Sequence, residues 1–342
     1  MARASGRPRV TDATVRGAQD PPVGGTWTTR APLPVAIAEV GVAQLGGRVY
    51  VVGGTAQHGG GPPTPVSSFN LAYDPSTDTW EERAPLPHSL SHVGVTSLDG
   101  TLYAMGGITD NVHLGPRSFA LSYDPTTDEW SELPPFSSPR GSLGVVAVDG
   151  QVHILGGLNA QQVVTVSPPG GPSITVGIGT VTTHEVYDPA SATWTEAKPL
   201  PGPPRGHMGV AVLGGNVHVF GGRINDYTDM LDRHDVYDPV ADAWTVAAPL
   251  PQPRSAGAFT VLEGLIIYAG GECKPGGGLF TPNAFEDVTA YDADADSWQT
   301  LTSLPQGRHA FGAATLGCVA YFAGGALLCG GGTSTDLLTL TL

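Results

Sequence analysis

The chain has 342 residues, of which only 14% are charged, and its formal net charge is −15. Its 48 glycines and 31 prolines are about double their usual share, which indicates many turns and few charged helix faces. The acidic balance disfavours binding to nucleic acid or to an anionic membrane surface, because both require clustered cations.

The first 22 residues contain arginines but no apolar segment, so we expect a disordered arm rather than a signal peptide. Residues 23–342 then form one folded domain. No apolar run is long enough to span a membrane as a helix. Three cysteines at unrelated positions do not make a disulfide framework. These features predict a soluble, cytoplasmic, monomeric protein with free thiols, although Cys273 and Cys329 could also pair or bind a metal; Cys318 lies on an opposite turn.

One pattern recurs from residue 26 to the C-terminus. A glycine pair ends an apolar run six times, and a tryptophan precedes each pair by 26 residues, or by 27 in the fourth unit. A repeat of about 50 residues is typical of a radial or solenoid array. The tryptophans are Trp27, Trp80, Trp130, Trp194, Trp244 and Trp298, and the pairs begin at Gly53, Gly106, Gly156, Gly221, Gly270 and Gly324.

Each unit contains four predicted strands. Two strands flank a tight turn such as Asp99-Gly100, which is a strong hairpin signal. A third strand ends at a tyrosine followed by Asp-Pro in four units, and a fourth strand contains the tryptophan. The sixth unit lacks its fourth strand, and residues 26–30 match one without a unit of their own. Pairing this segment with residues 337–342 would close a ring and remove an exposed sheet edge.

The glycine pair after a strand, the tyrosine and the tryptophan resemble the marks of the Kelch-repeat family. The resemblance covers residues 26–342 and all six units, although the split unit lacks the tyrosine. It implies an all-β fold, a six-bladed Kelch-type β-propeller closed by the N-terminal strand. The periodic tyrosines and tryptophans are expected to form the core between blades.

Function is expected on the face that holds the loops after the glycine pairs, because these loops are long and variable. They span residues 55–68, 108–118, 158–182, 223–233, 272–286 and 326–334. The fourth loop region is rich in acidic residues and histidine, faintly like the iron loop of plant Kelch specifier proteins, but a solvated acidic loop is favoured. The residues concerned are Asp226, Asp229, Asp232, His234 and Asp235.

The residues sixteen before each glycine pair predict an arginine arc at the channel mouth. Four consecutive units have Arg140, Arg205, Arg254 and Arg308 there, whereas the first two have Ile37 and Leu90. Guanidinium groups in a concave site suit a carboxylate, sulfate or phosphate, because each can donate two parallel hydrogen bonds. The alternative is structural, with each arginine bound to carbonyls of neighbouring loops.

The residues fourteen before each glycine pair are Glu39, His92, Ser142, His207, Ala256 and Ala310, and we expect them one level further into the channel. Glu39 is the least expected of them, because a carboxylate in a narrow channel needs a partner. His92 and His207 belong to the second and fourth blades, so we expect them to be too far apart to share a metal. We predict no metal and no cofactor.

Two functions remain open. The first is a binding module that recognises an acidic small molecule or an acidic peptide loop through Arg140, Arg205, Arg254 and Arg308, with Ser142 and His207 nearby. The second follows from a resemblance to bacterial Kelch mutarotases of N-acetylneuraminate, which implies Glu39 and His92 as proton carriers. Because a fold does not dictate a function, the sequence ranks binding first only narrowly.

Overall fold

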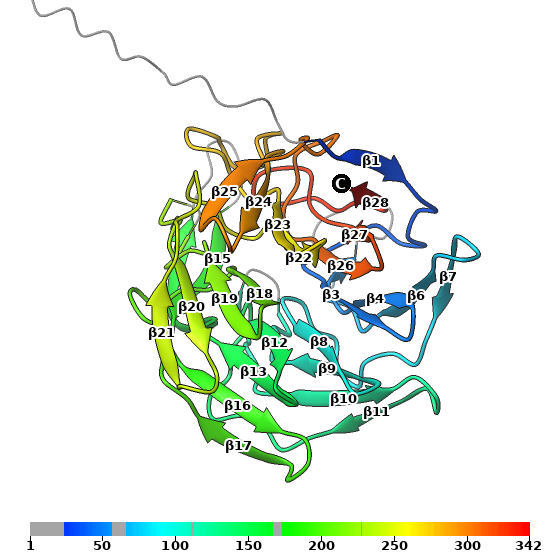
Figure 1. Ribbon diagram of the computed structural model, residues 1–342, viewed down its shortest axis with the longest axis vertical. Coiled ribbons are helices and arrows are strands. Elements are labelled where there is room, and N and C mark those ends of the chain that lie inside the picture. Colours follow the sequence, from blue (N-terminus) through cyan, green and yellow to red (C-terminus); the bar gives the residue numbers. More distant parts are fainter. Residues whose placement is uncertain (1–23, 57–65, 111–112, 167–172, 227) are drawn as a thin grey trace, which may run out of the picture.

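The computed structural model describes residues 24–56, 66–110, 113–166, 173–226 and 228–342. Six four-stranded antiparallel sheets surround a central channel (Figure 1). The prediction of an all-β, six-bladed propeller is therefore confirmed. The expected disordered arm at residues 1–22 lies outside the described residues. Within the described ranges, no helix has the length and apolar character needed to cross a membrane.

Each blade is a meander with its first strand at the channel. Blade 1 comprises β3 (Gly41–Leu45), β4 (Arg48–Val52), β6 (Asn70–Asp74) and β7 (Thr79–Glu82). Blade 2 comprises β8 (Gly94–Leu98), β9 (Thr101–Met105), β10 (Ala120–Asp124) and β11 (Glu129–Glu132). Blade 3 comprises β12 (Gly144–Val148), β13 (Gln151–Leu155), β16 (His184–Asp188) and β17 (Thr193–Glu196).

The second half of the ring repeats the plan. Blade 4 comprises β18 (Gly209–Leu213), β19 (Asn216–Phe220), β20 (His234–Asp238) and β21 (Ala243–Val246). Blade 5 comprises β22 (Ala258–Leu262), β23 (Leu265–Ala269), β24 (Val288–Asp292) and β25 (Ser297–Thr300). Blade 6 comprises β26 (Gly312–Leu316), β27 (Val319–Ala323), β28 (Leu337–Thr341) and, as its fourth strand, β1 (Thr26–Thr29).

The two ends of the chain close the ring in the way the sequence predicts. β1 and β28 lie side by side (Figure 1) and pair antiparallel, with Trp27 opposite Leu340. The Trp27 ring packs against Phe322 with a centroid distance of 5.1 Å, and its indole N–H donates to the Thr302 carbonyl at 2.9 Å. The outer edge of β28 is therefore covered.

The glycine pairs are needed because the next blade approaches them closely. At the second pair, the N–H of Gly107 donates to the carbonyl of Arg140 in blade 3 at 3.0 Å. A Cβ on Gly106, where φ is +66°, would lie only 2.4 Å from that same carbonyl oxygen. A side chain at Gly106 would thus push two blades apart. The second glycine of each of the other five pairs donates in the same way to the next blade.

The tyrosines and tryptophans of the repeat fasten each blade to the linker that leads into it. In blade 2, the Tyr123 hydroxyl donates to Asp128, whose carboxylate also accepts the N–H of Ala84 in the linker. The indole N–H of Trp130 donates to the carbonyl of Ala84 at 2.8 Å. All six tryptophans donate to a linker carbonyl. The predicted role of these residues between blades is confirmed.

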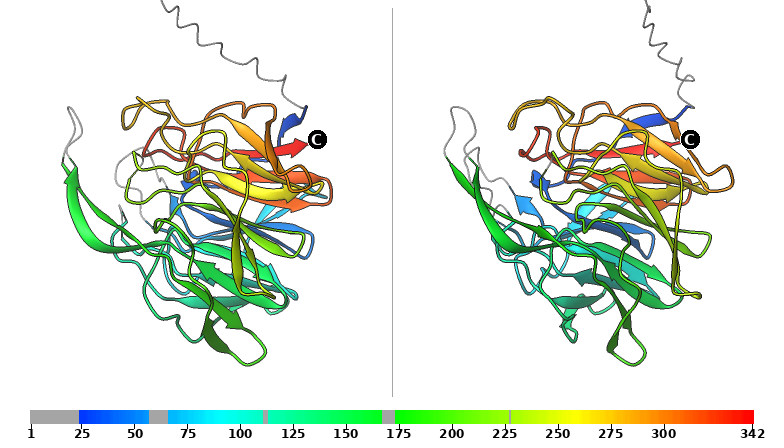
Figure 2. Two further views of the ribbon diagram at one scale, coloured as in Figure 1. Left: turned by 60° about the vertical axis from the view of Figure 1, so that its left-hand side comes forward. Right: turned by 90° about the vertical axis from the view of Figure 1, so that its left-hand side faces the viewer.

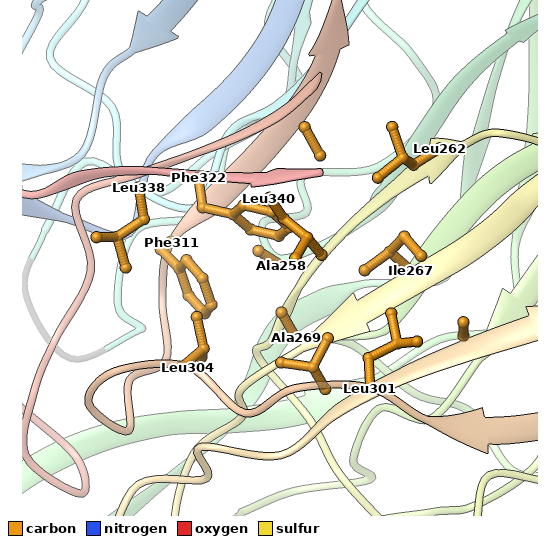
Figure 3. Packing of buried hydrophobic residues seen from close by; sticks show 13 residues of the cluster. Ala258, Leu262, Ile267, Ala269, Leu301, Leu304, Phe311, Phe322, Leu338 and Leu340 are labelled. Carbon is orange, nitrogen blue, oxygen red and sulfur yellow. The ribbon is translucent and has the colours of Figure 1, made fainter. Parts of the chain in front are cut away.

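Apolar side chains of adjacent blades fill the remaining space. Between blades 5 and 6, Ile267, Leu262 and Phe322 belong to one cluster, in which Leu301 and Leu304 of the linker lie below them (Figure 3). All five side chains are at most 4% exposed. Burial of this kind is the main stabilising contribution to the ring, at roughly 25 cal/mol per Å² of apolar surface.

Two expectations for the loops were wrong. Residues 158–182 contain a hairpin of β14 (Leu158–Val166) and β15 (Ile174–Thr180), which extends beyond the propeller body (Figure 2). A smaller pair, β2 (Ile37–Ala38) and β5 (Thr55–Ala56), lies beside blade 1.

Cys273 and Cys329 form a disulfide between the loops of blades 5 and 6, whereas Cys318 is free and exposed. The expectation of free thiols failed for the pair because ring geometry, not sequence spacing, places their Cα atoms 4.8 Å apart.

Blades 3 and 4 each contain a buried histidine pair at equivalent positions. His153 Nδ1 lies 2.9 Å from His184 Nε2, and His184 Nδ1 lies 3.0 Å from the Lys198 carbonyl. Both contacts can be hydrogen bonds between neutral imidazoles: His153 donates to His184, and His184 donates to the carbonyl. His218 and His234 repeat it in blade 4. Burial lowers the pKa of each of the four imidazoles to about 4.

These depressed pKa values predict a loss of stability as the pH falls below 7. Between pH 6.5 and 4 the unfolded chain binds more protons at these four sites than the folded chain, so the free energy of unfolding decreases with falling pH. From pH 7.5 to 6 these four histidines contribute about 3 kcal/mol to the loss, or about 4 °C in Tm, measured by calorimetry. The variant His218→Ile/His234→Val copies the apolar Ile267 and Val288 of blade 5 and should reduce the measured loss by half of this contribution, about 1.5 kcal/mol. An unchanged pH profile in the variant would contradict the assignment.

Candidate binding site at the channel mouth

A closed ring of backbone hydrogen bonds surrounds the mouth of the channel. One residue from each blade donates its N–H to the carbonyl of the equivalent residue one blade earlier, at 2.7–3.0 Å. All six residues have φ between 51° and 57°. This left-handed conformation, uncommon for residues other than glycine, lies just before each first strand. The ring consists of Glu39, His92, Ser142, His207, Ala256 and Ala310.

The six side chains of the ring line a cavity of about 140 Å³. Below them the wall is apolar, with Val42, Val95, Val145 and Phe259 among the lining residues. The first strands approach each other closely here, since a Cβ on Gly41 would lie 2.2 Å from a methyl group of Val95. The polar groups of the cavity are therefore gathered at the mouth.

Glu39 and His92 form a contact across blades 1 and 2. Glu39 Oε2 lies 2.9 Å from His92 Nε2, and their side chains are 24% and 7% exposed. Burial raises the pKa of the Glu39 carboxyl, but the charges of His92, His309 and His113 outweigh this effect and hold the pKa at about 2. Glu39 is thus a carboxylate at any physiological pH.

His207 lies on the opposite side of the ring, next to a buried arginine. Its Nε2 is 3.0 Å from Ser142 Oγ and 3.1 Å from a guanidinium nitrogen of Arg223. Arg223 is also paired with Glu272, so its charge is largely neutralised. Burial places the pKa of His207 well below its usual value. At neutral pH the ring is therefore neutral at His207 and negative at Glu39.

A third histidine joins the mouth from the loop after the second glycine pair. The ring of His113 lies 4.9 Å from that of His92 and 5.1 Å from that of His207. Its Nδ1 is buried and has no hydrogen-bond partner among the described residues, and the same is true of His207 Nδ1. Unpaired buried nitrogens are uncommon in folded proteins and indicate a place where a ligand can bind.

The predicted arginine arc at the mouth was wrong in its placement. Arg140, Arg205, Arg254 and Arg308 are at most 2% exposed and lie inside their blades. Each donates to backbone carbonyls near it, and three of them pair with the carboxylates of Glu185, Asp235 and Asp336. Arg254 donates instead to the Thr289 hydroxyl. The structural alternative accounts for all four.

The error has a local cause. Counting in steps of two assumes an extended strand, but the strand begins only at the residue twelve before the glycine pair, such as Gly144 in β12. Ser142 has a positive φ of 51°, which interrupts the alternation of side chains between it and Arg140. The ring residue and the arginine therefore point to different places.

The separation expected between His92 and His207 was also wrong. Their rings lie 5.4 Å apart, although they belong to blades 2 and 4. The hydrogen-bonded ring is narrow, and the small Ser142 between them leaves room for both imidazoles. The number of blades between two residues along the sequence therefore does not determine the distance between their side chains across the channel.

Four residues of the mouth were missed from the sequence. Arg223 and Glu272 follow directly after the glycine pairs of blades 4 and 5, where other blades have Thr55, Ile108, Leu158 and Ala326. An alignment of the six units on their glycine pairs would have shown that, at this position, only blades 4 and 5 have a charged residue. His113 lies in a loop that cannot be aligned with the loops of the other blades. His309 follows directly after Arg308. Burial lowers the pKa of His309 to about 4.

The acidic fourth loop does not form one site. His234 and Asp235 are fully buried in β20, where Asp235 pairs with Arg205 at 2.6 Å. Asp226 and Asp229 remain in the loop, and Asp226 accepts hydrogen bonds from Thr228. β20 begins at His234, directly after the predicted loop 223–233, so the strand separates His234 and Asp235 from the aspartates of the loop.

Known proteins are similar to this chain in repeat and fold. The Kelch motif model matches residues 89–137 and 204–251. Kelch repeat and BTB domain-containing protein 12 of Danio rerio is 36% identical over 88 residues, 25% of this chain and 14% of that protein. Kelch-like protein terF of Aspergillus terreus is 28% identical over 304 residues, 84% of this chain and 62% of that protein. The chain thus spans less than two thirds of these relatives' length. The solved structure of YjhT has a TM-score of 0.71 at 16% identity, covering 92% of this chain and 97% of YjhT.

Proposed function

Because this chain is a Kelch-repeat β-propeller, a fold of protein-interaction modules, we propose that its loop face is a binding surface. The channel mouth on this face binds a small polar ligand, held by Glu39, His92, Ser142 and His207. The convergence of these four side chains on one hydrogen-bonded ring supports the proposal above all.

The available groups favour a ligand with hydroxyl groups, such as a sugar. A carboxylate, imidazoles and a serine hydroxyl are donors and acceptors that suit hydroxyls. An acidic ligand would meet the carboxylate of Glu39, while the nearest guanidinium, that of Arg223, is already paired with Glu272. The preference for acidic ligands expected from the arginine arc therefore loses its basis.

Thermal unfolding in the presence of sugars tests this proposal. Glucose, galactose, glucuronate and N-acetylneuraminate are compared at fixed salt. A ligand at a hundredfold its Kd should add about 2.7 kcal/mol and raise the Tm by roughly 4 °C. The rise should be lost in Ser142→Ala, while Ser76→Ala, on an exposed turn away from the mouth, should keep it. A response to none of the four sugars, or an equal response in both variants, would contradict the proposal.

A second candidate, anomer exchange of a bound sugar, is supported by the contact between Glu39 and His92. A carboxylate with a pKa of about 2 is a weak base, so its role would be to orient and charge the imidazole, which transfers the proton. Glu39→Gln should then keep sugar binding but lower the exchange rate by about 100-fold, measured by NMR on the sugar that raises the Tm. An unchanged rate would exclude this role.

A further inference from the structure

The channel mouth gathers the imidazoles of three histidines from separate parts of the chain. His92 and His207 belong to the hydrogen-bonded ring, and His113 reaches them from the loop after Gly107. One nitrogen from each ring can be chosen so that all three lie within 4.8 Å of one another. A tetrahedral metal ion bound to three imidazoles at about 2.0–2.1 Å holds their nitrogens about 3.3 Å apart, so metal binding would draw the three side chains inward by up to about 1.5 Å.

Each of the three histidines has one buried nitrogen that makes no hydrogen bond among the described residues. These atoms are His92 Nε2, His113 Nδ1 and His207 Nδ1. His92 Nε2 faces Glu39 Oε2 at 2.9 Å. A single cation placed between the three nitrogens would satisfy all of them at once, and it would offset the unfavourable burial of these polar atoms.

The remaining nitrogens are held in place from behind. Ser91 Oγ lies 3.0 Å from His92 Nδ1, and Ser142 Oγ lies 3.0 Å from His207 Nε2. Arg223 Nη2 lies 3.1 Å from the same Nε2 and can only donate to it, so without a cation the His207 proton is on Nδ1. A cation bound at Nδ1 moves this proton to Nε2, where Ser142 Oγ accepts it and the guanidinium shifts toward Glu272. Such outer contacts orient the ligands of protein metal sites.

The charge and the ligand types point to a divalent transition metal. Glu39 supplies a carboxylate next to His92, and the positive charge of Arg223 is balanced by Glu272. Imidazole nitrogens with one carboxylate suit Zn²⁺, Co²⁺, Ni²⁺ or Cu²⁺ rather than Mg²⁺ or Ca²⁺, which prefer oxygen.

We propose that His92, His113 and His207 bind a divalent transition metal of the zinc type at the channel mouth, with Glu39 as the neighbouring carboxylate. The proposal does not rest on the proposed sugar binding, because it concerns the protein alone. Three imidazoles leave one position of a tetrahedral metal for Glu39, water or a ligand.

The test uses the full chain without a histidine tag, stripped with EDTA and dialysed. Titration calorimetry with ZnCl2 should show one Zn²⁺ per chain, and bound Co²⁺ should give the visible absorption of a tetrahedral site. His113→Gln, which changes only a loop residue, should weaken Zn²⁺ binding by more than about 100-fold, beyond the 10- to 100-fold typical of an outer-shell loss. His207→Gln should do the same.

The matched control is His88→Gln, which removes a partly exposed histidine that pairs with Glu132 and lies outside the cluster of His92, His113 and His207. It should bind Zn²⁺ as the unmodified chain does. Far-UV circular dichroism and Tm establish that each variant is folded, and His207→Gln serves if His113→Gln is not. Absence of Zn²⁺ binding by the unmodified chain, or equal affinity in the folded His113→Gln and His88→Gln variants, would overturn the proposal. Because no sugar is present, its failure is distinct from that of the sugar assay.

Discussion

Replacing Arg140 with alanine is expected to lower the free energy of unfolding by about 3–5 kcal/mol. The guanidinium is fully buried, pairs with Glu185 and donates to the carbonyls of Gly156 and Thr183. Its removal leaves a carboxylate that is 3% exposed without its counter-charge. Urea unfolding, followed by tryptophan fluorescence, measures the loss.

Two further variants make this prediction specific. Arg48→Ala removes an arginine that is one third exposed and pairs with the half-exposed Glu81, so it should cost less than about 1 kcal/mol. The double variant Arg140→Met/Glu185→Leu removes both buried charges and should recover most of the stability lost in Arg140→Ala. If Arg140→Ala were as mild as Arg48→Ala, the arginine would not be a structural element of the blade.

Removing β1 is expected to open the ring. A chain that begins after residue 30 lacks Trp27, its packing against Phe322 and the ladder to β28. Because Trp27 is partly buried, loss of its side chain alone should cost less than the roughly 3–5 kcal/mol of a fully buried aromatic residue, and the exposed edge of β28 would pair with other chains. We expect the Tm to fall by on the order of 10 °C, with aggregation on heating.

The matched truncation ends before Gly24 and keeps the whole of β1. It should unfold at the Tm of the full chain and show the same mass as the full chain by light scattering. The double variant Trp27→Ala/Phe322→Leu tests the packing separately from the ladder, and it should lie between the two truncations in Tm. Equal Tm values for both truncations would contradict closure through β1.

The architecture could be predicted from the sequence because each signature residue has a fixed backbone task. Gly106 must admit the carbonyl of Arg140, and Trp130 must reach the carbonyl of Ala84. Every blade needs the same backbone contacts, so the residues that make them recur at a regular spacing in the sequence. The match of residues 26–30 to a fourth strand also required only this periodicity.

The site could be predicted only in part. The ring residues Glu39, His92, Ser142 and His207 stand in register and were found by counting. The orientation of Arg140 was not, because the positive φ of Ser142 interrupts the alternation on which counting depends. His113 could not be found at all, since the loops after the glycine pairs differ in length and have no common register. Contacts across the channel, such as that of His92 with His207, depend on the width of the ring rather than on spacing along the chain.

The hydrogen bonds of the mouth all run in one rotational sense, because each N–H donates to the blade before it. Their dipoles follow one another around a circle and cancel across it, so the backbone contributes little field along the channel axis. The electrostatic character of the mouth is set by side chains, those of the ring together with His113, Arg223 and Glu272, while its diameter is set by the backbone. Ala256 and Ala310 leave two of the six positions almost unused. The backbone ring of the mouth is thus constant, and substitutions at its side-chain positions can change which ligand is recognised without changing the propeller fold.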